Sequence, residues 1–426
     1  MRCCAIWIIP VLGLAGSPSL PQPLSPEEIV QGAAERIELY RKSDAVVEVL
    51  GRDGRPIEGA SVAVRMTRHR FLFGCNMFAW DAQPTPEDQA TYRARFSDLL
   101  NYATLPFYWW MYEEAPNYDR IVAMAQWCAE RGIATKGHPL VWNHAAPGWL
   151  PADVDVILAL SDERVSDCVS RFRGLIDRWD VVNEATDPFR MDNLLSDAWR
   201  HAGRVEYTQH AFDLARAAGP EATLLINDYR LDEEYTALCD SLRNPDGSLQ
   251  YDAIGLQSHQ HGGVLSPERI WAVCERFARF GVPLHWTETT IVSGPQVKDG
   301  WVGSTAEGEE LQADQVELFY TIIFSHPANG ALTWWDLSDR HAWMGAPAGL
   351  LREDLTAKPA YERLLSLIKG EWWTSEDLTT DGDGRARFRG FHGDYDIAVT
   401  VGPAEARIRT ALAPGSETRV EVRIGG

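Results

Sequence analysis

Two glutamates each end a short apolar run. They are Glu184, in Trp-Asp-Val-Val-Asn-Glu, and Glu288, in His-Trp-Thr-Glu. Two carboxyl groups from separate strands are what glycoside hydrolysis requires, because one protonates the leaving oxygen and the other attacks the anomeric carbon. The proton donor needs a pKa raised by burial or by a neighbouring charge, and the nucleophile has to be ionised. Either glutamate alone could be a structural ion-pair partner. The pair, with Asn183 directly before Glu184, favours a catalytic site.

A regular alternation of strands and helices must position these glutamates. Short apolar runs predict eight strands, at 71–76, 102–107, 134–141, 179–182, 224–227, 253–257, 283–287 and 331–335. Helical patterns fall at 87–100, 118–131, 162–175, 267–280, 308–324 and 358–369. This order predicts an α/β protein with a TIM (β/α)8 barrel, in which the active site lies where the strands end. Both glutamates fall at such ends.

Patterns of period two flank the expected barrel of residues 71–370. Residues 43–70 have the pattern of a hairpin-like pair of strands, and period two returns in residues 371–426. Neither segment has enough strands to bury a face alone, so we expect both to form one small β-sandwich. They resemble the two halves of a carboxypeptidase-regulatory-like sandwich, and two unrelated appendages are the alternative. Residues 17–42 are expected to hold a linker and one helix over 27–42.

Charge and composition restrict the partners of the chain. Its 426 residues carry a net charge of −21, which argues against binding to nucleic acid or to an anionic membrane surface. Residues 1–16, apolar after Arg2, have the pattern of a secretory signal peptide, so we expect a secreted or periplasmic protein; an uncleaved anchor is the alternative. The five later cysteines lack metal-site spacing. We expect a monomer that acts on a polysaccharide or oligosaccharide, without metal or cofactor.

Six motifs follow one another at successive strand ends of the expected barrel. They are Gly137-His138-Pro-Leu-Val-Trp142, Trp179-Asp-Val-Val-Asn183-Glu184-Ala, Ile226-Asn227-Asp228-Tyr229, Ile254-Gly-Leu-Gln257-Ser-His259, Thr287-Glu288 and Thr333-Trp334-Trp335-Asp336. Together they resemble glycoside hydrolase family 10, the family of retaining endo-β-1,4-xylanases, over about residues 71–369. The resemblance implies that Glu184 is the general acid/base and that Glu288 is the nucleophile.

The resemblance also implies substrate-binding residues. Asn183 matches the residue that hydrogen-bonds the 2-hydroxyl of the first glycone sugar, which is the sugar that becomes attached to the nucleophile. His259 matches the donor to the nucleophile, and Gln257 lies two residues earlier on the same face of its strand. Four further residues match the wall of this subsite and its aromatic lid: His138, Trp142, Trp335 and Trp343. For each of the tryptophans, packing within the barrel is the alternative.

The chain departs from the family where the glycone sugars bind. The family has a Glu-Asn-x-x-Lys run after the second strand, whereas residues 105–110 are Leu-Pro-Phe-Tyr-Trp-Trp. Alternation would place Tyr108 and Trp110 on one side of this segment, with Phe107 and Trp109 on the other. At least one pair should therefore face the glycone side of the cleft, and Trp110 is a candidate substrate-binding residue. Aromatic stacking tolerates different hydroxyl patterns better than buried hydrogen bonds do. Arg230, which replaces the family's Asn, could meet a uronic acid branch or lie at the surface.

Three functions therefore stay open on the sequence alone. The first is a secreted retaining glycoside hydrolase that cleaves β-1,4-linked xylan or a related hemicellulose. The second keeps the mechanism and acts on another β-linked glycan, because aromatic residues replace the polar run. The third is a non-catalytic carbohydrate-binding barrel, which the presence of both carboxylates disfavours.

Overall fold

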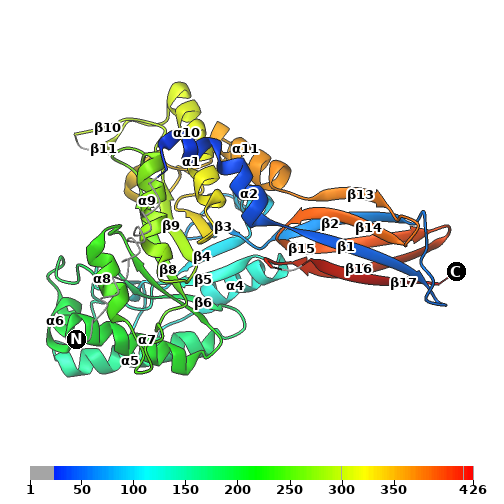
Figure 1. Cartoon of the computed structure of the whole chain (residues 1–426). Coiled ribbons are helices and arrows are strands. Elements are labelled where there is room, and N and C mark those ends of the chain that lie inside the picture. Colours follow the sequence, from blue (N-terminus) through cyan, green and yellow to red (C-terminus); the bar gives the residue numbers. More distant parts are fainter. Residues whose placement is uncertain (1–23, 299, 416, 426) are drawn as a thin grey trace, which may run out of the picture.

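A closed barrel of eight parallel strands forms the larger part of the molecule (Figure 1). The computed structural model describes residues 24–298, 300–415 and 417–425, so the expected signal peptide lies outside the described residues. The barrel confirms the predicted fold class. Its strands, in their order around the barrel, are β12 (Asn329–Trp334), β3 (Leu72–Asn76), β4 (Tyr102–Pro106), β5 (Ala134–His138), β6 (Arg178–Asn183), β7 (Thr223–Asp228), β8 (Ala253–His259) and β9 (Leu284–Thr290).

Helices surround the barrel. They are α3 (Pro86–Leu99), α4 (Asp119–Glu130), α5 (Val154–Arg171), α6 (Leu194–Ala202), α7 (Arg204–Ala218), α8 (Glu233–Ser241), α9 (Pro267–Ala278), α10 (Ala306–Ser325) and α11 (Pro359–Ser366), which continues into a π-helical turn, Leu367–Glu371. Helix α5 begins earlier than the predicted 162 because Asp153 caps it, its side chain accepting hydrogen bonds from Asp155 and Val156. Among the described residues, no helix is long and apolar enough to cross a membrane.

Seven strands build two further sheets beside the barrel. One sheet has the order β14-β1-β17 and the other the order β13-β2-β15-β16. Each sheet contains one strand from before the barrel, so the blue strands lie among the orange and red ones in Figure 1. The strands are β1 (Lys42–Gly51), β2 (Ser61–His69), β13 (Ser375–Thr379), β14 (Arg385–Phe391), β15 (Gly393–Val401), β16 (Ala404–Leu412) and β17 (Thr418–Ile424).

The prediction of a hairpin over residues 43–70 is wrong. Strands β1 and β2 lie in different sheets. The two edges of β1 pair with β14 and β17, and those of β2 pair with β13 and β15, so neither strand has an edge left for the other. Partners distant in the sequence therefore replace the local pairing. The likeness of this sandwich to the carboxypeptidase-regulatory-like family stays a prediction.

The sandwich joins the barrel at the end where the barrel strands begin. Strand β2 ends at His69, only a few residues before β3, and the ring of His69 packs edge-on against Phe73, Phe324 and Trp373. Before the sandwich, α1 (Pro26–Gln31) and α2 (Ala33–Arg41) are separated at Gly32, where one helix was predicted. The C-terminal ends of the barrel strands, where the predicted site lies, are at the opposite face.

The cysteines of the described residues are buried and free. They are Cys75, Cys128, Cys168, Cys239 and Cys274. Burial raises the pKa of the Cys128 and Cys274 thiols to about 12 in each case, which keeps them protonated and unreactive. They contribute to the core rather than to chemistry.

Candidate active site

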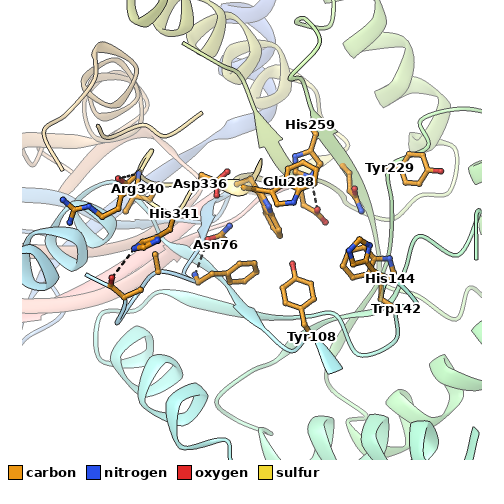
Figure 2. Close-up of a pocket in the computed structure, with 18 of the residues that line it drawn as sticks. Asn76, Tyr108, Trp142, His144, Tyr229, His259, Glu288, Asp336, Arg340 and His341 are labelled. Carbon is orange, nitrogen blue, oxygen red and sulfur yellow. Dashed lines mark hydrogen bonds and ion pairs between the residues drawn. The ribbon is translucent and has the colours of Figure 1, made fainter. Parts of the chain in front are cut away.

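A pocket of about 480 Å³ lies where the barrel strands end (Figure 2). Its lining is rich in aromatic rings and includes both candidate carboxylates. Most of the residues singled out from the sequence line this pocket: Trp110, Trp142, Glu184, Gln257, His259, Glu288, Trp335 and Trp343. The other two, His138 and Asn183, are almost fully buried and contact the lining residues from the barrel core. The barrel thus gathers all of them at one end.

The two glutamates share an unusual backbone conformation. Both Glu184 and Glu288 have a φ of 57°, in the left-handed region that residues other than glycine rarely adopt. The amide of Glu184 donates to the carbonyl oxygen of Asn227 at 2.8 Å, which holds this turn at the end of β6. Such backbone strain persists where the surrounding structure over-determines it, and it is concentrated at active sites. Both residues line the pocket.

A chain of amide hydrogen bonds connects the two carboxylates. Gln257 Nε2 lies 3.4 Å from Glu184 Oε1 and donates to Asn183 Oδ1 at 3.2 Å. Asn227 Nδ2 donates to Asn183 Oδ1 at 2.7 Å and to Glu288 Oε1 at 2.8 Å. Because these amides have few alternative partners in the buried site, they fix the relative position of the carboxylates. Asn227 falls in one of the six motifs, and its place at the end of a predicted strand is the one sign of this role in the sequence.

The surroundings of Glu288 favour its ionised form. Burial alone would raise the pKa of this carboxyl, but the hydrogen bond from His259 and the nearby charge of His138 bring the pKa below its usual value. His259 Nε2 lies 3.2 Å from Oε2, and His138 Nε2 lies 3.9 Å from Oε1. The other ring nitrogen of His138 is 2.7 Å from Asp180, which orients the ring. An ionised carboxylate in this place can act as a nucleophile.

Glu184 has the opposite tendency. Burial raises the pKa of this carboxyl, and the charge of Glu288 raises it further, while Arg190 and hydrogen bonds lower it in part. A carboxylic acid that keeps its proton at higher pH can protonate a leaving oxygen. The pair thus has pKa values displaced in opposite directions, as a general acid and a nucleophile require.

Arg190 was not found from the sequence. It lies in the loop after β6 and pairs through Nη2 with Glu184 Oε2. Its guanidinium also lies over the ring of Tyr229, with the centroid 5.1 Å away. No motif or spacing marks a loop arginine as a partner of the candidate acid, because only the folded loop brings the two side chains together.

We expect Arg190→Gln to move the alkaline limb of the pH–activity profile to higher pH. Glu184 must be protonated to donate, so activity falls as the pH rises through the pKa of Glu184. The positive charge of Arg190 lowers that pKa, and its removal therefore raises it. Profiles of kcat/KM on one glycoside test this expectation, with Arg230→Gln as the control. Arg230 pairs with Asp232 and Glu234 outside the pocket, and its removal should leave the limb in place. An unmoved limb in Arg190→Gln would contradict the pairing.

The aromatic segment after β4 divides between pocket and core. Tyr108 and Trp110 line the pocket, whereas Phe107 and Trp109 are buried, as alternation predicts. Trp110 stacks on Tyr108 with ring centroids 4.7 Å apart and lies 5.6 Å from Trp142. The segment is not extended throughout, because residues 109–111 form a 3-10 turn. The rings that replace the family's polar run therefore form part of the pocket wall.

Comparison with known proteins places the barrel in a family. The sequence profile described as glycosyl hydrolase family 10 matches residues 65–367. The endo-1,4-beta-xylanase of Geobacillus stearothermophilus is 30% identical over 256 residues, which cover 54% of this chain and 77% of that protein. The anti-sigma-I factor RsgI6 of Acetivibrio thermocellus is 27% identical over 387 residues. That alignment covers 87% of this chain, but the chain spans only 47% of the length of the factor.

Solved structures share the fold. Xylanase 10B of Thermotoga maritima superposes with a TM-score of 0.60 at 22% identity, covering 71% of this chain and 96% of that structure. Xylanase 10B of Thermotoga petrophila, solved with xylobiose, gives a TM-score of 0.59 with 71% of this chain covered. At this identity the likeness concerns the barrel alone. The profile match covers most of the chain and contains both glutamates. The chain belongs to glycosyl hydrolase family 10, and its barrel is that of a glycoside hydrolase.

Proposed function

We propose that the protein is a retaining glycoside hydrolase that cleaves β-1,4-linked xylan or a related hemicellulose by double displacement. The observation that carries the proposal is the pairing of a carboxyl with raised pKa, Glu184, and one with lowered pKa, Glu288, in one pocket of a family 10 barrel. The names of the relatives support xylan, since several are endo-1,4-beta-xylanases.

The proposed reaction has two steps. In the first, Glu288 attacks the anomeric carbon while Glu184 gives its proton to the leaving oxygen, and a covalent glycosyl-enzyme forms. In the second, Glu184, now ionised, takes a proton from water, and this water displaces Glu288 from the anomeric carbon. Asn183 hydrogen-bonds the 2-hydroxyl of the first glycone sugar in this proposal, and its hydrogen bonds with Asn227 and Gln257, between the two carboxylates, support that role.

A polysaccharide panel tests the substrate class. Release of short β-linked oligosaccharides from xylan, identified by mass spectrometry, is the expected result. If products come from another β-linked glycan instead of xylan, the proposed mechanism stands and the proposed substrate is wrong. Binding of glycans without any turnover, unchanged by Glu288→Gln, would favour the non-catalytic barrel. We also propose secretion, for which the leader-like residues 1–16 are the support, and a monomer remains our expectation.

We expect low activity on unbranched xylan compared with relatives that keep the polar run, and a gain or a shift in product length for Trp110→Ala. The reason is that stacked rings select less sharply among hydroxyl patterns than buried hydrogen-bonding groups do. Product lengths from linear xylan, resolved by mass spectrometry, give the readout. Trp127→Ala, a half-buried tryptophan on α4 outside the pocket, is the control. Vigorous cleavage that Trp110→Ala leaves unchanged would show that Trp110 is only a packing residue.

A further inference from the structure

One buried carboxyl in the pocket wall has no part in the mechanism described above. Asp336 follows β12 and lines the pocket, and only 6% of this residue is exposed. Its Oδ2 atom is buried and has no hydrogen-bond partner among the described residues. Leaving a buried polar atom unpaired is destabilising, so such an atom calls for a partner. Rotation of the carboxyl group about its Cβ–Cγ bond can turn this oxygen toward the pocket, where a substrate hydroxyl can supply the partner.

Asp336 lies on the glycone side of the pocket. Figure 2 shows Tyr229 and Asp336 toward opposite ends of the pocket with Glu288 between them. Glu184 belongs to the Tyr229 end, because Arg190 contacts both of them. The acid stands beside the leaving group, so the leaving part of the glycan lies toward Tyr229. The retained sugars therefore extend toward Asp336.

The position of Trp335 separates Asp336 from the first glycone sugar. The ring of Trp335 lies edge-on to His138 and His259, the two histidines that contact Glu288, with centroids 5.5 and 5.9 Å away. It therefore borders the sugar that Glu288 attacks. Phe78 packs against Trp335 at 5.4 Å and lines the pocket with Asp336. The sugar that Asp336 can reach is then the next one along the chain.

Other polar groups at this end of the pocket already have partners. Arg340 donates to Gln83 at 3.3 Å and to Asp88 at 3.2 Å. His341 Nε2 is 3.3 Å from the carbonyl oxygen of Ala82. Burial raises the pKa of Asp336 to about 7, although hydrogen bonds from the Trp343 backbone and the Asn76 side chain lower it in part. Much of Asp336 is thus protonated at neutral pH, and a carboxylic acid can donate a hydrogen bond to a sugar hydroxyl.

We propose that Asp336 binds a hydroxyl group of the second glycone sugar and so makes the enzyme select chains over single sugars. The inference rests on the proposed function and names a binding residue for it. Asp336 would supply a polar contact of the kind that residues 105–110 lack. It is a specificity-determining residue and takes no part in bond cleavage.

Two chromogenic substrates with one leaving group test the proposal. We expect Asp336→Ala to lower kcat/KM on 4-nitrophenyl β-xylobioside by about 10- to 100-fold, since a buried hydrogen bond to the second sugar is lost. On 4-nitrophenyl β-xyloside, which has no second sugar, the change should stay within about threefold. Asp336→Asn keeps the volume and a donor, so it should retain most of the xylobioside activity. Asp232→Asn and Asp232→Ala, at a capping position outside the pocket, are the matched controls.

The outcomes separate this proposal from the proposed function. Equal losses on both substrates would overturn it, because Asp336 would then act on the catalytic centre or on the fold. An Asn variant as impaired as the Ala variant would overturn it as well. If the wild type cleaves neither glycoside, the proposed function fails. Calorimetric titration with xylotriose then tests whether Asp336 binds the sugar chain. Binding at least about tenfold weaker in Asp336→Ala supports the site. Unchanged binding, or none in the wild type, overturns it.

Discussion

Replacement of either glutamate of the proposed catalytic pair is expected to lower the hydrolysis rate by at least about ten-thousand-fold. Glu184→Gln and Glu288→Gln preserve the shape of each side chain and should leave folding largely intact. Glu288→Gln removes the proposed nucleophile, and Glu184→Gln removes the proposed proton donor. Steady-state rates on an unactivated glycoside, whose leaving group needs a proton, measure the loss. Glu376→Gln, exposed on the sandwich strand β13, is the control and should keep full activity.

Azide distinguishes the roles of the two residues. In Glu288→Ala, azide can enter the space left by the nucleophile and attack the anomeric carbon directly, so the glycosyl azide should have inverted configuration. In Glu184→Ala, the intermediate on Glu288 still forms from an activated glycoside, and azide attacks it to give the retained configuration. The reverse pattern of products would exchange the two assignments.

Lys136→Met is expected to lower the free energy of unfolding by about 3–5 kcal/mol. Lys136 Nζ lies 2.6 Å from Asp180 Oδ2, and both side chains are almost fully buried in the barrel. Burial raises the pKa of Asp180, but the charge of Lys136 and the hydrogen bond with His138 outweigh burial and keep the carboxyl ionised. Removal of Lys136 leaves a buried carboxylate without its strongest partner. Urea denaturation measures the change.

Two comparisons make the stability result specific. Lys42→Met breaks the more exposed pair with Glu38 and should cost about 1 kcal/mol or less. The double variant Lys136→Met/Asp180→Asn should recover part of the loss, because no buried charge is then left without a partner. A Lys136→Met protein as stable as the wild type would show that Asp180 does not depend on this lysine.

The barrel could be predicted from the sequence because its signals are local. Each strand is a short apolar run between helical patterns, and each predicted run overlaps a strand of the barrel. The pairing of β1 with β14 and β17 could not be predicted, since those partners lie more than three hundred residues away along the chain. A turn at Asp53-Gly54 favours a hairpin locally, and the competition among distant strand edges overrides it.

In the candidate site, too, some residues could be predicted from the sequence and others could not. Glu184 and Glu288 could be proposed from the sequence because they lie within motifs at the ends of predicted strands. Arg190 and Asp336 could not, because a loop conformation and a missing partner are properties of the folded chain. The left-handed backbone conformation of both glutamates could not be predicted either, because their flanking residues have the pattern of an ordinary strand.

The anomeric configuration of the first product tests the central claim most directly. Proton NMR of a β-linked xylo-oligosaccharide during hydrolysis observes the new reducing end before it mutarotates. Double displacement through Glu288 predicts that the β-anomer appears first and the α-anomer later, as the product equilibrates. Initial appearance of the α-anomer would mean that water attacks directly, and the assignment of Glu288 as a nucleophile would be wrong.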